Sequence, residues 1–192
     1  MIKPTSKISK ILRRFGASER AVAAVEFAII APILILLFVG TIEISLAVAV
    51  DRKVSRISSS VADLITQSSK FTGDEINEIM NIADRIMFPY DDVPKISIVG
   101  IEIKNDEAKV TWACQKNGAP KPAVGSTVSV PSQIKVNDTF LVSATVTTDH
   151  EPAFKFVGYE NGRLTFDDAS IEMSEQMFLR PRLGGQVEVT GC

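Results

Sequence analysis

The sequence is poor in the residues from which metal sites and histidine-based active sites are built. Its 192 residues include one histidine and two cysteines, which leaves little for a zinc site. No glycine-rich nucleotide-binding pattern occurs either. A net charge of −2 argues against a general nucleic-acid binder, which needs a basic surface. We therefore expect neither an enzyme nor a cofactor, metal or nucleic-acid partner.

Charged residues are distributed very unevenly along the chain. Residues 1–20 carry six bases and one acid, which gives +5. Residues 21–50 carry two acids and no base. The remaining 15 of 21 bases and 20 of 23 acids fall in residues 51–192, which gives −5. These zones are a basic arm, an almost uncharged stretch and an acidic domain, and the apolar fraction of 45% excludes wholesale disorder.

The middle zone predicts a membrane span. Residues 27–42 contain no charge, and an apolar stretch of about 20 residues is long enough to cross a bilayer. The positive-inside rule keeps the basic arm in the cytoplasm, which places residues 51–192 in the periplasm or at the cell surface. Two alternatives remain open: a buried core helix, and a cleaved secretory signal that ends at the small-residue pattern Ala47-Val48-Ala49.

Two carboxylates, Glu26 and Glu43, lie near the two ends of this stretch. They are 17 residues apart, which is roughly 26 Å along a helix and close to the hydrocarbon thickness of about 30 Å. A carboxylate at this depth is costly unless it reaches the interface, is protonated or finds a partner. Both are interpreted first as headgroup-level anchors, although Glu26 has no base three or four residues away with which to pair.

The residues around Glu26 form a recognisable pattern. AVEFA at residues 24–28 follows a basic leader and a small residue, Pro32 lies in the apolar stretch, and Gly40-Thr41-Ile42-Glu43 closes it. This pattern resembles the TadE-like family of pseudopilins, minor pilin-like components of the tight-adherence (Tad, Flp-type) type IVb pilus assembly system. The late Arg180-Pro181-Arg182 is a second, short match. The resemblance implies a structural, non-catalytic protein of the bacterial inner membrane that acts in pilus biogenesis and surface adhesion.

The resemblance also implies processing by a prepilin peptidase. That enzyme cuts after a small residue so that glutamate falls at mature position five and an aromatic residue at position six. Here the cut would fall between Ala21 and Val22, with Glu26 and Phe27 in those positions. Glu26 of one subunit could then neutralise the new amine of Val22 in a neighbour, and this pairing would set the stagger between subunits. Processed members usually have glycine where this chain has Ala21, so a cleaved chain and an uncleaved, membrane-anchored chain both remain open.

The residues after the span predict an α+β, pilin-like domain in which helices precede an antiparallel sheet. Apolar residues at three- and four-residue steps extend the first helix from Val54 to Ile65. A capping box at Thr72–Glu75 starts a second helix, which ends before Pro89. A period of two predicts strands after that. The expected strands are 96–103, 110–112, 140–148, 154–159, 163–166 and 169–180, with a turn at 104–107, a loop over 117–131 and a hairpin turn at Asn161-Gly162.

Cys114 and Cys192 both fall in the external domain. An oxidising periplasm would let them form a disulfide that holds the tail near the strand of Trp112, and two free thiols are the alternative. His150 is expected at the surface, and Ser58–Ser60 are expected on a solvated helix face. The leading hypothesis is thus a TadE-like pseudopilin that contacts the membrane, other pilin-like subunits and the assembly machinery. The alternative is a single-span, membrane-anchored periplasmic sensor or adhesin domain unrelated to pili.

Overall fold

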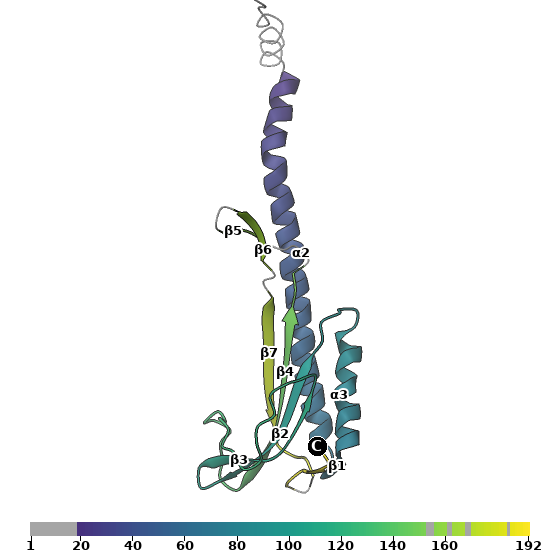
Figure 1. Ribbon diagram of the computed structural model, residues 1–192, viewed down its shortest axis with the longest axis vertical. Coiled ribbons are helices and arrows are strands. Elements are labelled where there is room, and N and C mark those ends of the chain that lie inside the picture. The colour runs from purple at the N-terminus through teal and green to yellow at the C-terminus, as the bar shows by residue number, and fades with distance from the viewer. Residues whose placement is uncertain (1–18, 153–155, 161–162, 168–169, 184) are drawn as a thin grey trace, which may run out of the picture. The chain divides into compact units, whose positions relative to one another are not determined.

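The computed structural model describes residues 19–152, 156–160, 163–167, 170–183 and 185–192. For residues 19–21, 156–160 and 163–167 it describes the backbone alone. The chain divides into two compact units, residues 1–45 and residues 46–192. The long helix α2, Glu19–Thr66, belongs to both (Figure 1).

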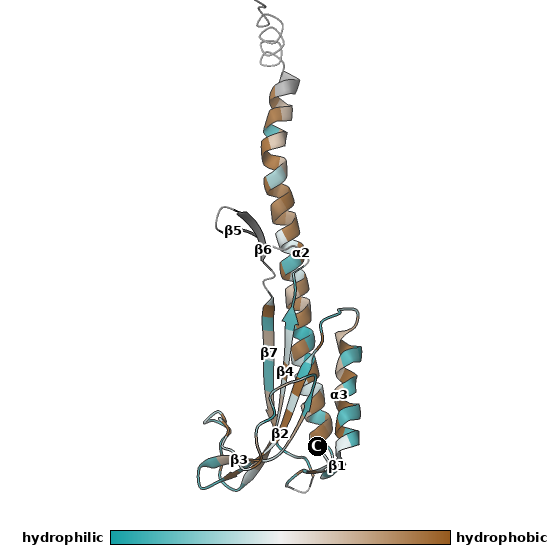
Figure 2. Ribbon diagram, in the orientation of Figure 1, coloured by the Kyte–Doolittle hydropathy of each residue, from teal (hydrophilic) through white to brown (hydrophobic). Residues whose placement is uncertain are grey.

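The N-terminal part of α2 is apolar (Figure 2). Its large hydrophobic side chains from Val22 to Phe38 are 49–72% exposed. Within the part of the chain that the structure describes, α2 is the one helix long and apolar enough to cross a membrane, and no residue of its most apolar 18-residue window is buried. The buried-core-helix alternative is therefore wrong for this segment. Pro32 lies inside the helix without ending it, which is tolerated more readily in membrane helices than in soluble ones.

The C-terminal part of α2 lies in the second unit and is amphipathic. Val54, Ile57, Val61 and Ile65 are fully buried, so the predicted extension of the first helix is confirmed. Ser58 was expected to be solvated but is also fully buried. Its Oγ donates a hydrogen bond of 2.9 Å to the carbonyl oxygen of Ala144, because a buried hydroxyl needs a partner and a strand carbonyl has a second lone pair to offer.

Helix α3, Gly73–Met87, begins at the predicted capping box. The Thr72 hydroxyl accepts from the backbone N–H of Glu75, and the Glu75 carboxylate accepts from the backbone N–H of Thr72 at 2.8 Å. This backbone hydrogen bond, with a second one from the Thr72 hydroxyl, lowers the pKa of Glu75 from its ordinary value. One face of α3 is buried, through Ile76, Met80, Ala83 and Met87.

Four strands form an antiparallel sheet in the order β3-β2-β4-β7. The predicted alternating segments are confirmed as β2 (Lys95–Lys104), β3 (Glu107–Lys116), β4 (Thr139–His150) and β7 (Ile171–Leu179). The predicted turn between β2 and β3 is also confirmed, with Asn105 at φ 50° and Asp106 at φ 59°. This left-handed pair is the conformation that matches strand twist in a two-residue hairpin.

A short antiparallel pair, β5 (Phe156–Glu160) and β6 (Arg163–Asp167), lies between β4 and β7 in the chain. It confirms the two strands predicted on either side of the hairpin turn. The turn residues themselves, Asn161-Gly162, lie outside the described residues.

The sheet has a hydrophobic cluster on each face. The larger cluster joins α2 and α3 to side chains such as Ile98, Trp112 and Val146. The smaller one packs Ile101, Val110 and Leu141 beneath residues of the long loop between β3 and β4, namely Val128, Val130 and Ile134. The sheet is therefore covered by helices on one side and by a loop on the other.

Two three-residue strands were not expected from the sequence. Strand β1, Lys70–Thr72, connects α2 to α3, and β8, Glu188–Thr190, ends two residues before Cys192. They pair in parallel, with Phe71 opposite Val189. Because an isolated two-stranded pair is marginal in water, other contacts must hold the C-terminal residues in place.

Candidate functional site

The residues predicted to act in assembly lie along the exposed first part of α2. Glu26 is exposed, and within the described residues it makes no hydrogen bond or ion pair. Val22 is 49% exposed and Phe27 is 69% exposed. Ala21 lies within α2, where the structure describes its backbone. The side chains of Val22, Glu26 and Phe27 therefore lie on an open helix surface rather than in an enclosed site.

The other three features of the family pattern follow on the same helix. Pro32 is exposed, and Gly40 is half-buried, with nothing within 4 Å of the position that a Cβ would occupy. Glu43 is half-buried. The hydroxyl of Thr41 donates to the carbonyl oxygen of Leu37 at 2.8 Å, which gives this polar side chain a partner on its own helix.

A second candidate site lies at the C-terminus of the external domain. We call residues 187–192 the C-terminal strap. Cys192 forms a disulfide with Cys114 on β3, with the two Cα atoms 5.2 Å apart and a sequence separation of 78. Cys114 is 2% exposed, whereas Cys192 is exposed. The strap is thus covalently attached to the sheet at its last residue.

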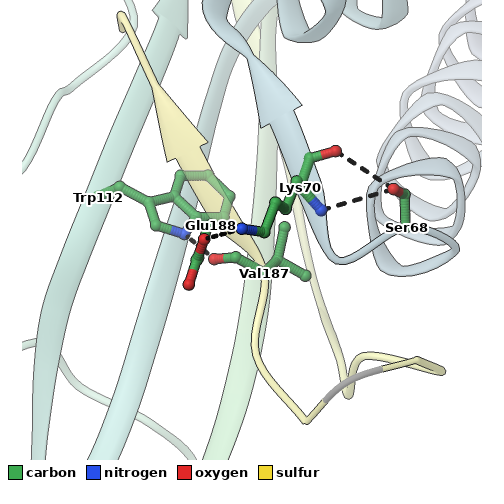
Figure 3. A network of polar contacts seen from close by, with 5 residues as sticks. All are labelled: Ser68, Lys70, Trp112, Val187 and Glu188. Carbon is green, nitrogen blue, oxygen red and sulfur yellow. Dashed lines mark hydrogen bonds and ion pairs between the residues drawn. The ribbon is translucent and has the colours of Figure 1, made fainter.

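Trp112 holds the other end of the strap. Its indole Nε1–H donates to the carbonyl oxygen of Val187 at 2.7 Å, in a buried position (Figure 3). Gly100, opposite Trp112 on β2, makes room for the ring, because a Cβ there would lie 2.3 Å from Nε1. The pairing of β2 and β3 also shifts register between Gly100 and Ile101. The one tryptophan of the chain therefore fixes the strap through a site that tolerates no side chain at residue 100.

Backbone contacts complete the strap. The N–H of Glu188 donates to the carbonyl oxygen of Ser69 at 2.9 Å, and Lys70 forms an exposed ion pair with Glu188 at 3.1 Å (Figure 3). Gly73, the first residue of α3, lies so close to Gly191 that a Cβ on residue 73 would be 2.3 Å from the Gly191 carbonyl oxygen. The strap thus closes over the point where α2 ends and α3 begins.

Arg182 joins the segment before the strap to the end of α2. Its backbone N–H donates to the carbonyl oxygen of Thr66 at 2.9 Å, and its guanidinium pairs with the carboxylate of Asp63. Arg182 is the last residue of the late Arg-Pro-Arg match. The late Arg-Pro-Arg match therefore contacts the C-terminal end of α2, the helix that also carries the AVEFA pattern.

Lys53 contacts the C-terminal end of α3, and the sequence did not predict this interaction. Its Nζ donates to the carbonyl oxygens of Ile86 at 2.7 Å and Phe88 at 2.5 Å, and lies 5.1 Å from the centre of the Tyr90 ring. These carbonyls end α3, where the backbone has no intrahelical donors left. A basic residue of α2 thus caps α3. The local sequence of α3 gives no signal for this cap, because Lys53 lies 33 residues before Ile86.

His150 was expected at the surface, and this is wrong. It is 7% exposed, and its Nδ1 lies 3.0 Å from the carboxylate of Asp92. Within the part of the chain that the structure describes, its Nε2 and the hydroxyl of Thr148, on the same side of β4, are buried without a hydrogen-bond partner. The described part of the chain contains no group of three or more His, Cys, Asp or Glu residues placed to hold a metal ion.

Comparison with known proteins supports the pattern found around Glu26. The family model described as TadE-like protein matches residues 21–63. No curated protein and no solved structure matches the chain. The matched residues begin at the predicted cleavage position and run along α2 to Asp63, the partner of Arg182. The chain therefore matches the TadE-like family model over residues 21–63, all of which lie on α2.

Proposed function

We propose that this chain is a TadE-like minor pseudopilin of a Tad (Flp-type) type IVb pilus assembly and secretion system. It would act structurally in pilus biogenesis and surface adhesion. The observation that carries the proposal is the exposed apolar part of α2, which bears Glu26, a carboxylate unpaired among the described residues, inside the region that matches the TadE-like model. Such a surface is unfavourable in water and is suited to lipid and to other apolar helices.

The proposed topology is a single pass through the bacterial inner membrane. Residues 1–20, with a charge of +5, would remain in the cytoplasm. The domain that follows the span would face the periplasm or the cell surface, where a disulfide between Cys114 and Cys192 is stable. Ala47 packs against the core and Val50 is buried. A signal-peptidase cut after Ala49 would therefore divide the folded domain, which favours an anchor over a secretory signal.

Glu26 would provide the contact between subunits. A lone carboxylate inside an apolar helical bundle is costly, so it favours any arrangement that supplies a cation. Cleavage between Ala21 and Val22 would create an amine on Val22, and Glu26 of a neighbour could pair with it beside Phe27. A wrong stagger would leave both charges unpaired, so the pair would select one register. Glu43, near the other end of the span, would remain an anchor at the headgroups.

N-terminal sequencing of the protein extracted from membranes tests the processing step. A terminus at Val22 is expected, and an intact Met1 or Ile2 terminus would contradict it. The assembly role is tested by crosslinking this protein to pilin-like subunits in cells that carry Glu26→Gln. We expect loss of the crosslinks, and their retention in the matched control Glu43→Gln. Unchanged pili and attachment after deletion of the gene would instead favour a sensor or adhesin unrelated to pili.

A further inference from the structure

The disulfide that closes the C-terminal strap joins two cysteines in very different surroundings. Cys114 is 2% exposed and belongs to the larger hydrophobic cluster, between the sheet and the helices. Cys192, its partner, is exposed. A disulfide opens when a thiolate attacks one of its two sulfur atoms, and access is one of the factors that decide which atom is attacked. The two ends of this bond therefore differ as targets for an external thiol.

Packing covers Cys114 from the sheet and from α3. On the sheet it lies opposite Ile98, which is fully buried. The Nζ of Lys116, two residues further along β3, donates to the carboxylate of Asp84 at 2.6 Å and so holds α3 against this strand. An attacking thiolate approaches in line with the sulfur–sulfur bond. Attack on the sulfur of Cys114 would therefore bring the thiolate through a packed hydrophobic cluster.

The backbone next to Cys192 is packed, but residue 192 itself is not enclosed. A Cβ on Gly73 would lie 2.3 Å from the carbonyl oxygen of Gly191 and 3.3 Å from the backbone nitrogen of Cys192, so the end of the strap rests on the first residue of α3. Because Cys192 is exposed and lies outside the hydrophobic cluster, attack on its sulfur requires no opening of the core.

One effect acts in the opposite direction. Attack on Cys192 expels the thiolate of Cys114, and a charge that leaves into an apolar cluster is less stable than one that leaves into water. This effect lowers the rate by a graded factor, because the leaving sulfur carries only part of a charge in the transition state. Attack on Cys114 instead requires α3 and the sheet to separate before any bond can form. Access therefore decides the site of attack.

We propose that Cys192 is the exchange site of this disulfide, through which a carrier thiol or disulfide opens and closes the strap, and that Cys114 is the resolving cysteine. In opening, the carrier thiolate bonds to the sulfur of Cys192 while the bond to Cys114 breaks. The electron pair of that bond leaves on the sulfur of Cys114, which then takes a proton from water.

Closing follows the same path in reverse. The thiolate of Cys192 first displaces one sulfur from an oxidised carrier and forms a mixed disulfide. The thiolate of Cys114 then attacks the sulfur of Cys192 and releases the second carrier thiolate, so the carrier gains the two electrons that the two cysteines lose. The exchange site depends on the fold of the external domain alone and does not rest on the proposed function.

Peptide mapping of the wild-type chain tests the exchange site. The oxidised full-length chain in detergent micelles is exposed briefly to reduced glutathione, quenched with acid and alkylated with N-ethylmaleimide. Trypsin then places the two cysteines in separate peptides, residues 110–116 and 183–192, because a basic residue precedes each. We expect glutathione on Cys192 with maleimide on Cys114 in at least about tenfold excess over the reverse labelling. Comparable amounts, or glutathione mainly on Cys114, would overturn the proposal.

The same chain unfolded in urea is the matched control, because it has the same two sulfur atoms without the fold. Its two adducts should form in comparable amounts. A preference for Cys192 that persists in urea would come from the local sequence rather than from burial, and would also overturn the proposal.

Cys114→Ala isolated from cells identifies the carrier, because it keeps Cys192 without the resolving cysteine. An adduct with the mass of glutathione indicates a small thiol, and a protein-sized adduct indicates a thiol–disulfide oxidoreductase; either supports the exchange site. A Cys192 thiol that stays free in cells whose wild-type chain is oxidised would contradict closure through Cys192. A wild-type chain that lacks the bond in cells would instead contradict the proposed periplasmic location, and the peptide mapping would still decide the exchange site.

Discussion

The disulfide between Cys114 and Cys192 is expected to dominate the stability of the C-terminal strap. It closes a loop of 78 residues, and the chain-entropy relation gives about 15 cal/mol/K, or about 4.5 kcal/mol at 25 °C, for a loop of that length. Folded domains are stable by about 5–15 kcal/mol in total. Loss of this one bond is therefore expected to remove a large share of the free energy of unfolding of the external domain.

Cys192→Ser is the cleanest perturbation, because Cys192 is exposed and its replacement leaves no buried hydroxyl. Urea unfolding in detergent micelles is followed by the fluorescence emission of Trp112. The indole of Trp112 donates a hydrogen bond to Val187 of the strap, so its emission reports on the strap. With a urea slope of about 2 kcal/mol/M, the midpoint should fall by about 2 M. The native emission should also shift to the red, since the three-residue pairing of β1 and β8 is too short to keep the strap closed alone.

Two comparisons make this prediction refutable. Wild type after reduction should match Cys192→Ser within about 0.5 kcal/mol, because both lose the same loop closure. Cys114→Ser should be less stable than either, since Cys114 is buried and the new hydroxyl has to be desolvated. A midpoint for Cys192→Ser within about 0.3 M of wild type would refute the reasoning, because on a typical urea slope it would show that the strap contributes almost nothing to the folded domain.

Three further predictions follow from the contacts of the external domain. Lys53→Met should destabilise the domain by about 2 kcal/mol, since a charged donor to several carbonyls is lost, whereas Lys70→Met should cost below about 1 kcal/mol because its ion pair is exposed; equal midpoints in urea would contradict the helix cap. Gly73→Ala should cost about 1–3 kcal/mol by overpacking the strap, and the cost should nearly vanish in a Cys192→Ser background, where the strap can move; an unchanged cost there would refute the contact. The pKa of Glu75 is lowered in the folded state, so its contribution is fully present above its ordinary value of 4.5 and is lost as the pH falls through the lower folded value; Glu75→Gln, which keeps the capping geometry, should remove this part of the acid sensitivity in unfolding curves between pH 5 and pH 3.

The sequence by itself determined the parts of this protein that depend on local pattern. The apolar run around Pro32 and the amphipathic run after Val50 predicted α2, because helix periodicity and membrane length can be counted along the chain. The capping box at Thr72 predicted the start of α3, because both of its hydrogen bonds join residues three apart. The alternating strands and the turn at Asn105 followed for the same reason. The TadE-like pattern also lies within one helix.

Tertiary structure alone decided the contacts between segments distant in sequence. Strands β1 and β8 have three residues each, too few for alternation to identify them, and they exist because the disulfide and Trp112 bring Val187 and its neighbours to the end of α2. Lys53 caps a helix that ends 34 residues later, at Met87. His150 and Ser58 are polar residues that read as solvated, but the fold supplies a partner for each, Asp92 in one case and a strand carbonyl in the other. A buried polar group is stable only where a hydrogen-bond partner lies beside it. The packing of distant segments, rather than the local sequence, decides where that partner lies.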